Sequence, residues 1–191
     1  MLKYALLGFL NYSSMTGYDL KQFMDHSTAH FWHAKQSQIY MTLKTLEEEG
    51  LITSVVEEQQ SRPDRRVYTI TDSGRAALDA WLAEPLVETE KTKSSLMLRL
   101  FFSARLSREA LISELRIQQG LHRRQAEFFR TETRATIQGI AAQNPAVRED
   151  AVLWDATRHF GEMLEELYVR WLDETIQTLE AQPEGMAEQQ S

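Results

Sequence analysis

Three histidines in the first third of the chain are the side chains best suited to hold a metal ion. His26, His30 and His33 follow at intervals of four and three residues, which would place three imidazoles on one face of a helix. The chain has no cysteine, and no carboxylate obviously completes the set. A metal site is therefore the weaker interpretation, and the sequence predicts neither a metal nor another cofactor.

Motifs that would build a catalytic centre are missing from the sequence. It contains no nucleophile elbow, no zinc-hydrolase motif and no glycine-rich phosphate loop. Carboxylates do cluster at Glu47-Glu48-Glu49 and Glu165-Glu166, but adjacent residues point in different directions around a helix and cannot converge on one substrate. We therefore expect a protein that is not an enzyme.

The stretch 35–50 has the pattern of a helix that binds in a DNA major groove. Ile39, Leu43 and Leu46 recur at helical spacing, and Gly50 is typical of the position that ends a helix. The other face carries polar and cationic side chains, and the N-terminal half of such a helix contacts base edges. Its candidate DNA-binding residues are Lys35, Gln36, Ser37, Gln38, Tyr40, Met41 and Lys44. Taken alone, this helix could also be an ordinary amphipathic one with a solvated outer face.

A β-hairpin is predicted directly after this helix. Residues 51–56 and 66–70 are β-prone and flank a polar stretch that contains the turn-forming pair Pro63-Asp64. Arg62, Arg65 and Arg66 cluster at its tip and returning strand, where they would contact phosphate or the minor groove. A solvated loop is the alternative for these arginines.

Shorter helices are predicted on both sides of this pair. An almost continuously apolar helix covers 1–12, 13–15 form a turn, and Thr16 caps a helix that begins at Gly17. Another helix begins near Arg75. Together these elements predict a winged helix-turn-helix with a two-stranded β-hairpin wing.

The second half of the chain is predicted to be entirely helical. A polar, proline-containing segment at 84–93 separates it from the first half. Helices are expected at 94–104, at 107–142 with a break at Asn144-Pro145, and at 151–181. The sequence thus predicts a mainly α protein with a winged helix-turn-helix DNA-binding domain at 1–88 and an α-helical dimerisation domain at 89–191.

Two apolar stripes run along the last predicted helix, which is more than one packing partner requires. One contains Trp154, Tyr168, Leu172, Ile176 and Leu179. The other is the predicted dimerisation surface, formed by Leu153, Phe160, Leu164, Leu167 and Trp171. Aromatic residues of this half, Phe101, Phe128, Trp154 and Tyr168, are candidates for an effector pocket, although aromatic residues at helical spacing also suit a plain core.

Composition limits how such a protein could bind DNA. The net charge is −7 over 191 residues, so bulk attraction does not favour nucleic acid and a local basic patch, doubled by dimerisation, is required. No apolar run approaches the length of a membrane span, and the N-terminus lacks a signal-peptide pattern. We expect a cytoplasmic protein without a membrane partner.

The ordered motifs of the chain resemble those of the PadR-like transcriptional regulators. The resemblance rests on residues 2–10, 15–20, 31–32, 38–40, 43–52 and 66–71, together with Gly74. The start at 98–102 and the two long helices are similar to the virulence-activator-like subgroup. The resemblance implies a winged helix that binds double-stranded DNA as a homodimer, usually a repressor and sometimes an activator, and some relatives respond to phenolic or planar hydrophobic compounds.

Within the resemblance, Gln38 and Tyr40 match the recognition-helix motif of the family. His33 and Ser37 stand where many members have proline and glycine, which leaves the operator sequence open. The function expected is a sequence-specific transcriptional regulator, a repressor released by a small aromatic or hydrophobic effector. The alternative is a winged-helix protein-interaction module without specific DNA binding, which the acidic balance favours and the arginine cluster opposes.

Overall fold

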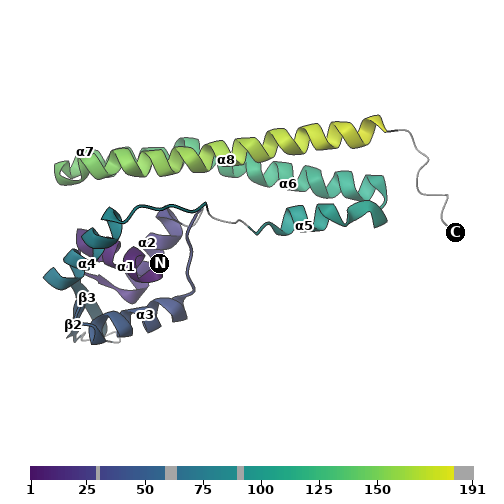
Figure 1. Cartoon of the computed structure of the whole chain (residues 1–191). Helices are drawn as coiled ribbons and strands as arrows, with labels where there is room; N and C mark the ends of the chain where they lie inside the picture. The colour runs from purple at the N-terminus through teal and green to yellow at the C-terminus, as the bar shows by residue number, and fades with distance from the viewer. Residues whose placement is uncertain (29–30, 59–63, 90–92, 183–191) are drawn as a thin grey trace. The chain divides into compact units, whose positions relative to one another are not determined.

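The computed structural model describes residues 1–28, 31–58, 64–89 and 93–182 of the 191-residue chain (Figure 1). The chain forms two compact units, Met1–Glu90 and Lys91–Ser191. The fold is mainly helical with a small antiparallel sheet, which confirms the predicted winged helix and the long C-terminal helix. Within the described segments, every helix falls short of the length and apolarity that a membrane crossing needs.

The first unit is a winged helix-turn-helix. Its elements are α1 (Leu2–Tyr12), β1 (Met15–Thr16), α2 (Gly17–Ser27), α3 (Gln36–Glu48), β2 (Ile52–Glu57), β3 (Arg65–Ile70) and α4 (Asp72–Ala83). The sheet has the order β1-β3-β2, with both pairs antiparallel. The predicted two-stranded hairpin is confirmed as β2 and β3. The turn predicted at 13–15 differs at its end, because Met15 begins a short third strand in which Met15 and Thr16 pair with Tyr68 and Val67 and cover the free edge of β3.

Local capping fixes the ends of the two central helices. Thr16 Oγ1 accepts a hydrogen bond from the backbone N–H of Asp19 at 3.1 Å, and the Asp19 carboxylate accepts one from the N–H of Thr16 at 3.0 Å, so the predicted cap is confirmed. Gly50 has φ +71° and ends α3, with the N–H of Leu51 donating back to the carbonyl of Leu46 at 2.9 Å. The start of α2 and the end of α3 are thereby set by residues next to them in sequence.

One apolar core joins the helices of this unit to the sheet. Leu6 and Leu10 of α1, Leu20 of α2 and Leu43 of α3 are buried together with Ile70 of β3. Burying a side chain of this size contributes roughly 1.5–3 kcal/mol. The core therefore holds α3 by its inner face and leaves its outer face to solvent.

The second unit is a helical hairpin with a short leading helix. It contains α5 (Ser95–Phe101), the 3₁₀ turn η1 (Ser103–Arg105), α6 (Arg108–Phe128), the π-helical turn η2 (Phe129–Thr133), α7 (Arg134–Gln143), the 3₁₀ turn η3 (Pro145–Val147) and α8 (Arg148–Ala181). Figure 1 shows α8 running alongside α6. The long helix expected at 107–142 is divided into α6 and α7 by η2.

Candidate nucleic-acid interface

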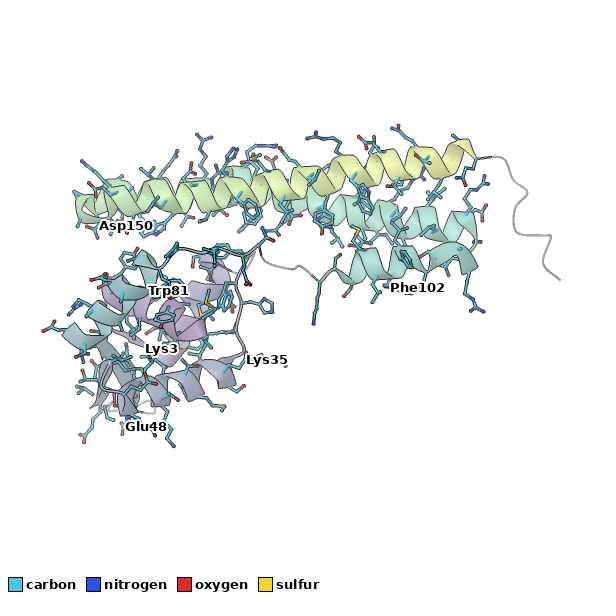
Figure 2. The ribbon with its side chains drawn as sticks, viewed as in Figure 1. Lys3, Lys35, Glu48, Trp81, Phe102 and Asp150 are labelled. Carbon is cyan, nitrogen blue, oxygen red and sulfur yellow. The ribbon has the colours of Figure 1, made fainter. Side chains whose placement is uncertain are left out.

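The outer face of α3 is the most prominent polar surface of the winged unit. Ile39, Leu43 and Leu46 are fully buried, so the rest of the helix is turned outward. Figure 2 labels Lys35 and Glu48 at its two ends. All seven residues predicted to contact DNA from this segment are solvent-exposed: Lys35, Gln36, Ser37, Gln38, Tyr40, Met41 and Lys44. Their roles as DNA contacts stay predictions.

Gln38 has a second task at the start of α3. Its Oε1 accepts a hydrogen bond from the backbone N–H of Lys35 at 2.9 Å, which satisfies a donor that the helix itself leaves unpaired. The side-chain amide NH₂ of Gln38 can still donate to a base or a phosphate. The cap thus restricts Gln38 to one rotamer and aims that NH₂ group.

Tyr40 packs against the start of α2. A Cβ added to Gly17 would lie 2.5 Å from Tyr40 Cε1, so only glycine lets the ring approach this closely. This contact fixes the spacing between the two helices of the helix-turn-helix. This role of Gly17 was not predictable from the sequence, since nothing local to it indicates the approach of a ring from α3.

Successive side chains of β3 point to opposite faces of the sheet, so the two described wing arginines, Arg65 and Arg66, lie on opposite faces. Arg66, Tyr68 and Ile70 share one face of β3, and because Ile70 and Tyr68 are buried, this face is the inner one. The Arg66 side chain therefore points toward α3. Its guanidinium is paired within the unit and its side chain is 52% exposed, so phosphate contact by Arg66 stays a prediction.

Three groups surround the Arg66 guanidinium. Its Nη2 donates to Glu47 Oε2 at 2.6 Å, its Nε donates to Ser54 Oγ at 2.7 Å, and it lies over the Tyr68 ring at 5.7 Å. Ser54 Oγ in turn donates to Glu47 Oε1 at 2.5 Å. The hydrogen bond from Ser54 and the neighbouring Arg66 lower the pKa of the Glu47 carboxyl.

Arg65 lies on the opposite face of β3 and remains a candidate for phosphate. Its guanidinium is 3.5 Å from the Glu57 carboxylate and 4.0 Å from that of Asp19, both at the exposed surface. Exposed pairs of this kind contribute at most about 1 kcal/mol and can be exchanged for a stronger anion. Arg62, the third predicted wing arginine, lies outside the described residues.

A groove of about 440 Å³ lies between α2, α3 and the start of β3. It is lined by Thr16, Gly17, Tyr18, Asp19, Tyr40, Asp64, Arg65 and Arg66. The groove therefore connects the recognition helix, the first turn of α2 and the wing into one surface of mixed charge.

The histidine interpretation gains no support from the structure. His30 lies outside the described residues, and among those described no three His, Cys, Asp or Glu side chains are grouped closely enough to share a metal ion. In the second unit, His122 stacks on Tyr168 at 4.3 Å and its Nδ1 is hydrogen-bonded to Glu165. His122 thus joins α6 to α8.

In the second unit, α8 uses one face for its own chain. Leu172 and Ile176 are buried against Leu115 of α6. Of the predicted dimerisation residues, Leu153, Phe160 and Leu167 are exposed and Leu164 is half-buried. Trp171 is partly buried and packs against the core cluster of its own chain, and its role in dimerisation stays a prediction.

A buried arginine of α8 contacts the π-helical turn. Arg158 is only 5% exposed, and its Nη1 donates to the carbonyl of Phe129 in η2 at 3.4 Å. Asp155 and Glu162 neutralise it at 2.5 and 2.6 Å. Hydrogen bonds from Arg158 lower the pKa of both carboxyls and, with the pairing, raise the pKa of Arg158. Arg158 thus joins α8 to η2.

The four candidate effector residues do not meet within one chain. Trp154 and Tyr168 are fourteen positions apart on α8, which is about 21 Å along a helix and too far for one small-molecule pocket. Phe101 is 82% exposed on α5, and Phe128 packs beside Phe129. The four residues therefore do not share one pocket within the second unit, and an effector pocket between domains or subunits stays a prediction.

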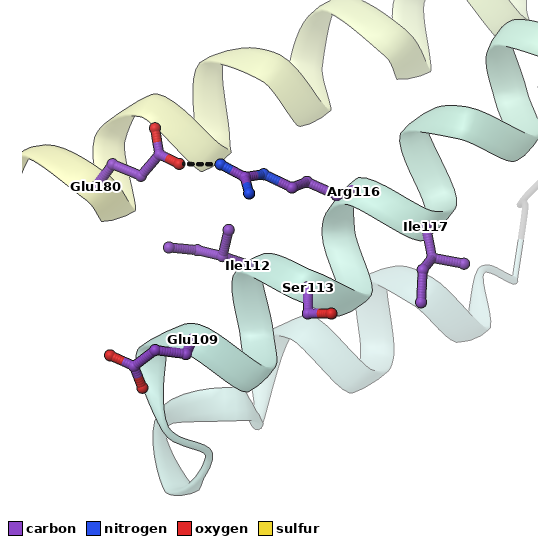
Figure 3. Close-up of a pocket in the computed structure, with 6 residues that line it drawn as sticks. All are labelled: Glu109, Ile112, Ser113, Arg116, Ile117 and Glu180. Atoms are coloured by element: carbon purple, nitrogen blue, oxygen red, sulfur yellow. Dashed lines mark hydrogen bonds and ion pairs between the residues drawn. The ribbon is translucent and has the colours of Figure 1, made fainter.

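Figure 3 shows a different hollow, between α6 and the end of α8. It has a volume of about 520 Å³ and is lined by Glu109, Ile112, Ser113, Arg116, Ile117 and Glu180. An ion pair between Arg116 and Glu180 at 2.6 Å crosses it, so its polar groups already satisfy one another. It contains none of the predicted effector residues.

Comparisons with known proteins cover nearly the whole chain. Residues 6–80 match the transcriptional regulator PadR-like family, and residues 92–180 match the virulence activator alpha C-term family. The negative transcriptional regulator PadR of Bacillus subtilis (strain 168) is 32% identical over 181 residues, which are 92% of this chain and 96% of that protein.

Solved structures give the same result. The crystal structure of Bacillus subtilis PadR in complex with operator DNA has a TM-score of 0.79 at 29% identity, covering 93% of this chain and 97% of that one. The structure of the same protein in complex with p-coumaric acid has a TM-score of 0.70 at 28% identity, covering 94% and 98%. Both units thus have counterparts in one known architecture.

Proposed function

The chain belongs to the PadR-like family of transcriptional regulators, and on that basis we propose that it is a homodimeric repressor that binds specific DNA sequences. The observation that carries this proposal is the outward face of α3, where seven exposed polar, aromatic and cationic residues follow a capped N-terminus. Such a face suits the major groove. A repressor is proposed because Bacillus subtilis PadR, which is 32% identical and covered over 96% of its length, is a negative transcriptional regulator.

Individual residues take different parts in this proposal. Base edges or the adjacent phosphates are contacted by Ser37, Gln38, Met41 and Lys44. The sugar-phosphate backbone of the DNA is contacted by Lys35 and Tyr40. Arg65 binds phosphate from the wing, and Arg62, although outside the described residues, is proposed for the same role.

Dimerisation is proposed to occur through the exposed stripe of α8, which comprises Leu153, Phe160, Leu164 and Leu167. An apolar stripe left uncovered on a long helix is typical of an interface between subunits. A dimer also doubles the few cations of the DNA-binding face and matches two half-sites on one side of the duplex.

An effector that releases the protein from DNA is proposed to be a small planar aromatic acid. The support comes from the related protein whose structure contains p-coumaric acid. The alternative function, a winged-helix module that binds protein and not specific DNA, has the acidic balance of the chain in its favour.

The decisive experiment measures binding to a duplex from the region upstream of the gene that encodes this chain, against a random duplex, over a salt series. We expect a complex that outcompetes random DNA by on the order of a thousandfold at physiological salt. Equal and weak binding to both duplexes would favour the protein-interaction module. Adding p-coumaric acid to the specific complex then tests the effector class, with benzoic acid and an uncharged phenol as comparison ligands.

A further inference from the structure

The cluster of Glu47, Ser54 and Arg66 connects the recognition helix to both strands of the wing. Glu47 belongs to the last turn of α3, Ser54 to β2 and Arg66 to β3. Each of the three side chains contacts the other two, at 2.5, 2.6 and 2.7 Å. The recognition helix and both strands of the wing are thus tied at one point.

The position of this cluster on the sheet shows what it restrains. On the inner face, the buried pair Ile52 and Ile70 is followed by Ser54 and Tyr68 and then by Val56 and Arg66, nearer the tip of the wing. Tyr68 is the last buried side chain toward the tip of the wing, so the apolar core does not hold the outer part of the wing against α3. Beyond the core, the described contacts between the wing and α3 are those of Glu47 with Ser54 and Arg66.

We propose that Glu47 and Ser54 hold Arg66 as a strut that sets the position of the wing relative to α3, which makes all three positioning residues for DNA binding. The inference rests on the proposed function. It assigns Arg66 to orienting the wing and leaves phosphate contact to Arg65. It also gives a favourable role in DNA binding to Glu47, an acidic residue that electrostatics alone would count as harmful.

The neighbouring residue Glu48 provides a matched control. Its side chain is 64% exposed, and its only described ion pair is a long one to Lys44 at 3.8 Å. Glu47→Ala and Glu48→Ala each remove one negative charge from the same end of the same helix. If only charge matters, both variants bind DNA more tightly. The strut predicts that Glu47→Ala binds the specific duplex about tenfold more weakly, while Glu48→Ala binds as well as the wild type or better.

Ser54→Ala tests the strut without any change of charge. It removes one acceptor for Arg66 and one donor to Glu47, and we expect about threefold weaker binding with an unchanged dependence on salt. This variant also protects the test against misfolding, because Ser54 is only half-buried and is not part of the apolar core. Urea unfolding of each variant establishes that it is folded in the binding assay.

Arg66→Met and Arg65→Ala separate positioning from phosphate contact. A lost phosphate contact makes the slope of log K against log salt shallower by about 0.9 per contact, or about 1.8 for the two copies of a dimer. We expect that change for Arg65→Ala and not for Arg66→Met, although both weaken binding. The double variant Glu47→Ala, Arg66→Met should lose no more affinity than either single variant, since both remove the same strut.

The results distinguish this inference from the function on which it rests. If the wild type prefers its upstream duplex but Glu47→Ala binds like Glu48→Ala, the strut is wrong and the proposed function stands. A flattened salt slope for Arg66→Met would also overturn the strut and return Arg66 to phosphate contact. If the wild type shows no preference for that duplex or for one selected from random sequence, both proposals fall together.

Discussion

Replacing Leu167 by alanine tests the dimerisation surface of α8 with a single small change. Leu167 is 55% exposed in the single chain, on the opposite side of α8 from the buried residues Leu172 and Ile176. Leucine and alanine are both good helix formers, and the side chain contributes little to the monomer core. The substitution should therefore weaken the dimer and leave the folding of each chain almost unchanged.

The size of the effect follows from the exposed fraction. The three carbon atoms removed are worth about 2.4 kcal/mol at about 0.8 kcal/mol each when fully buried. With 55% of Leu167 still exposed, dimerisation can bury about 1.3 kcal/mol of this per chain. A two-fold interface uses the residue twice, so the dimer loses about 2.6 kcal/mol, which raises its Kd about 80-fold.

Sedimentation equilibrium over a wide concentration range measures this Kd directly. Leu82→Ala is the matched control, because Leu82 on α4 is a leucine of similar exposure at 66% in the winged unit. An unchanged Kd for Leu167→Ala would refute the assignment of this stripe to the interface. An equal rise for Leu82→Ala would show that the interface is not confined to α8.

Three further substitutions test other contacts. Gly50→Ala places a Cβ on a backbone with φ +71° and should lower the free energy of unfolding by about 1 kcal/mol, measured in urea. Gly17→Ala would put a methyl group against the Tyr40 ring, and we expect about tenfold weaker DNA binding in a chain that still folds. Arg158→Met should lower the free energy of unfolding by about 2 kcal/mol at neutral pH, because Glu162 loses its main partner. The folded-state pKa of Glu162 is lowered, so this loss should be complete above the unfolded pKa of about 4.3 and shrink as pH falls through the lower folded value.

Features that depend on neighbouring residues were predictable from the sequence. The apolar stripe of α3, its end at Gly50 and the cap at Thr16 all follow from residues within one or two helical turns. The two stripes of α8 were also predictable, because helical spacing alone separates Leu172 from Leu167. These local patterns were enough to identify the winged helix and the faces that it exposes.

Features that depend on distant partners were missed. Strand β1 has only two residues and exists because β3, fifty positions later, presents a free edge. The π-helical turn η2 accepts a hydrogen bond from Arg158 of α8, and no sequence pattern near Phe129 indicates this contact. Arg66 is an intermediate case. Its alternation with Tyr68 and Ile70 already places it on the inner face of β3, but its partner on α3 could be identified only in the structure.

The charge of the winged unit explains why internal pairing matters for a DNA-binding protein of this kind. Residues 1–90 contain eight lysines and arginines and thirteen aspartates and glutamates, so this unit, with a net charge of −5, is acidic itself. Pairing with the basic side chains anchors several of the acids away from the exposed face of α3, as in Lys3 with Glu49 and Arg66 with Glu47. Among the described residues, the cations proposed to contact phosphate are Lys35, Lys44 and Arg65. Affinity that cannot come from charge must come from shape and base contacts, and both depend on holding the wing and α3 at a fixed distance.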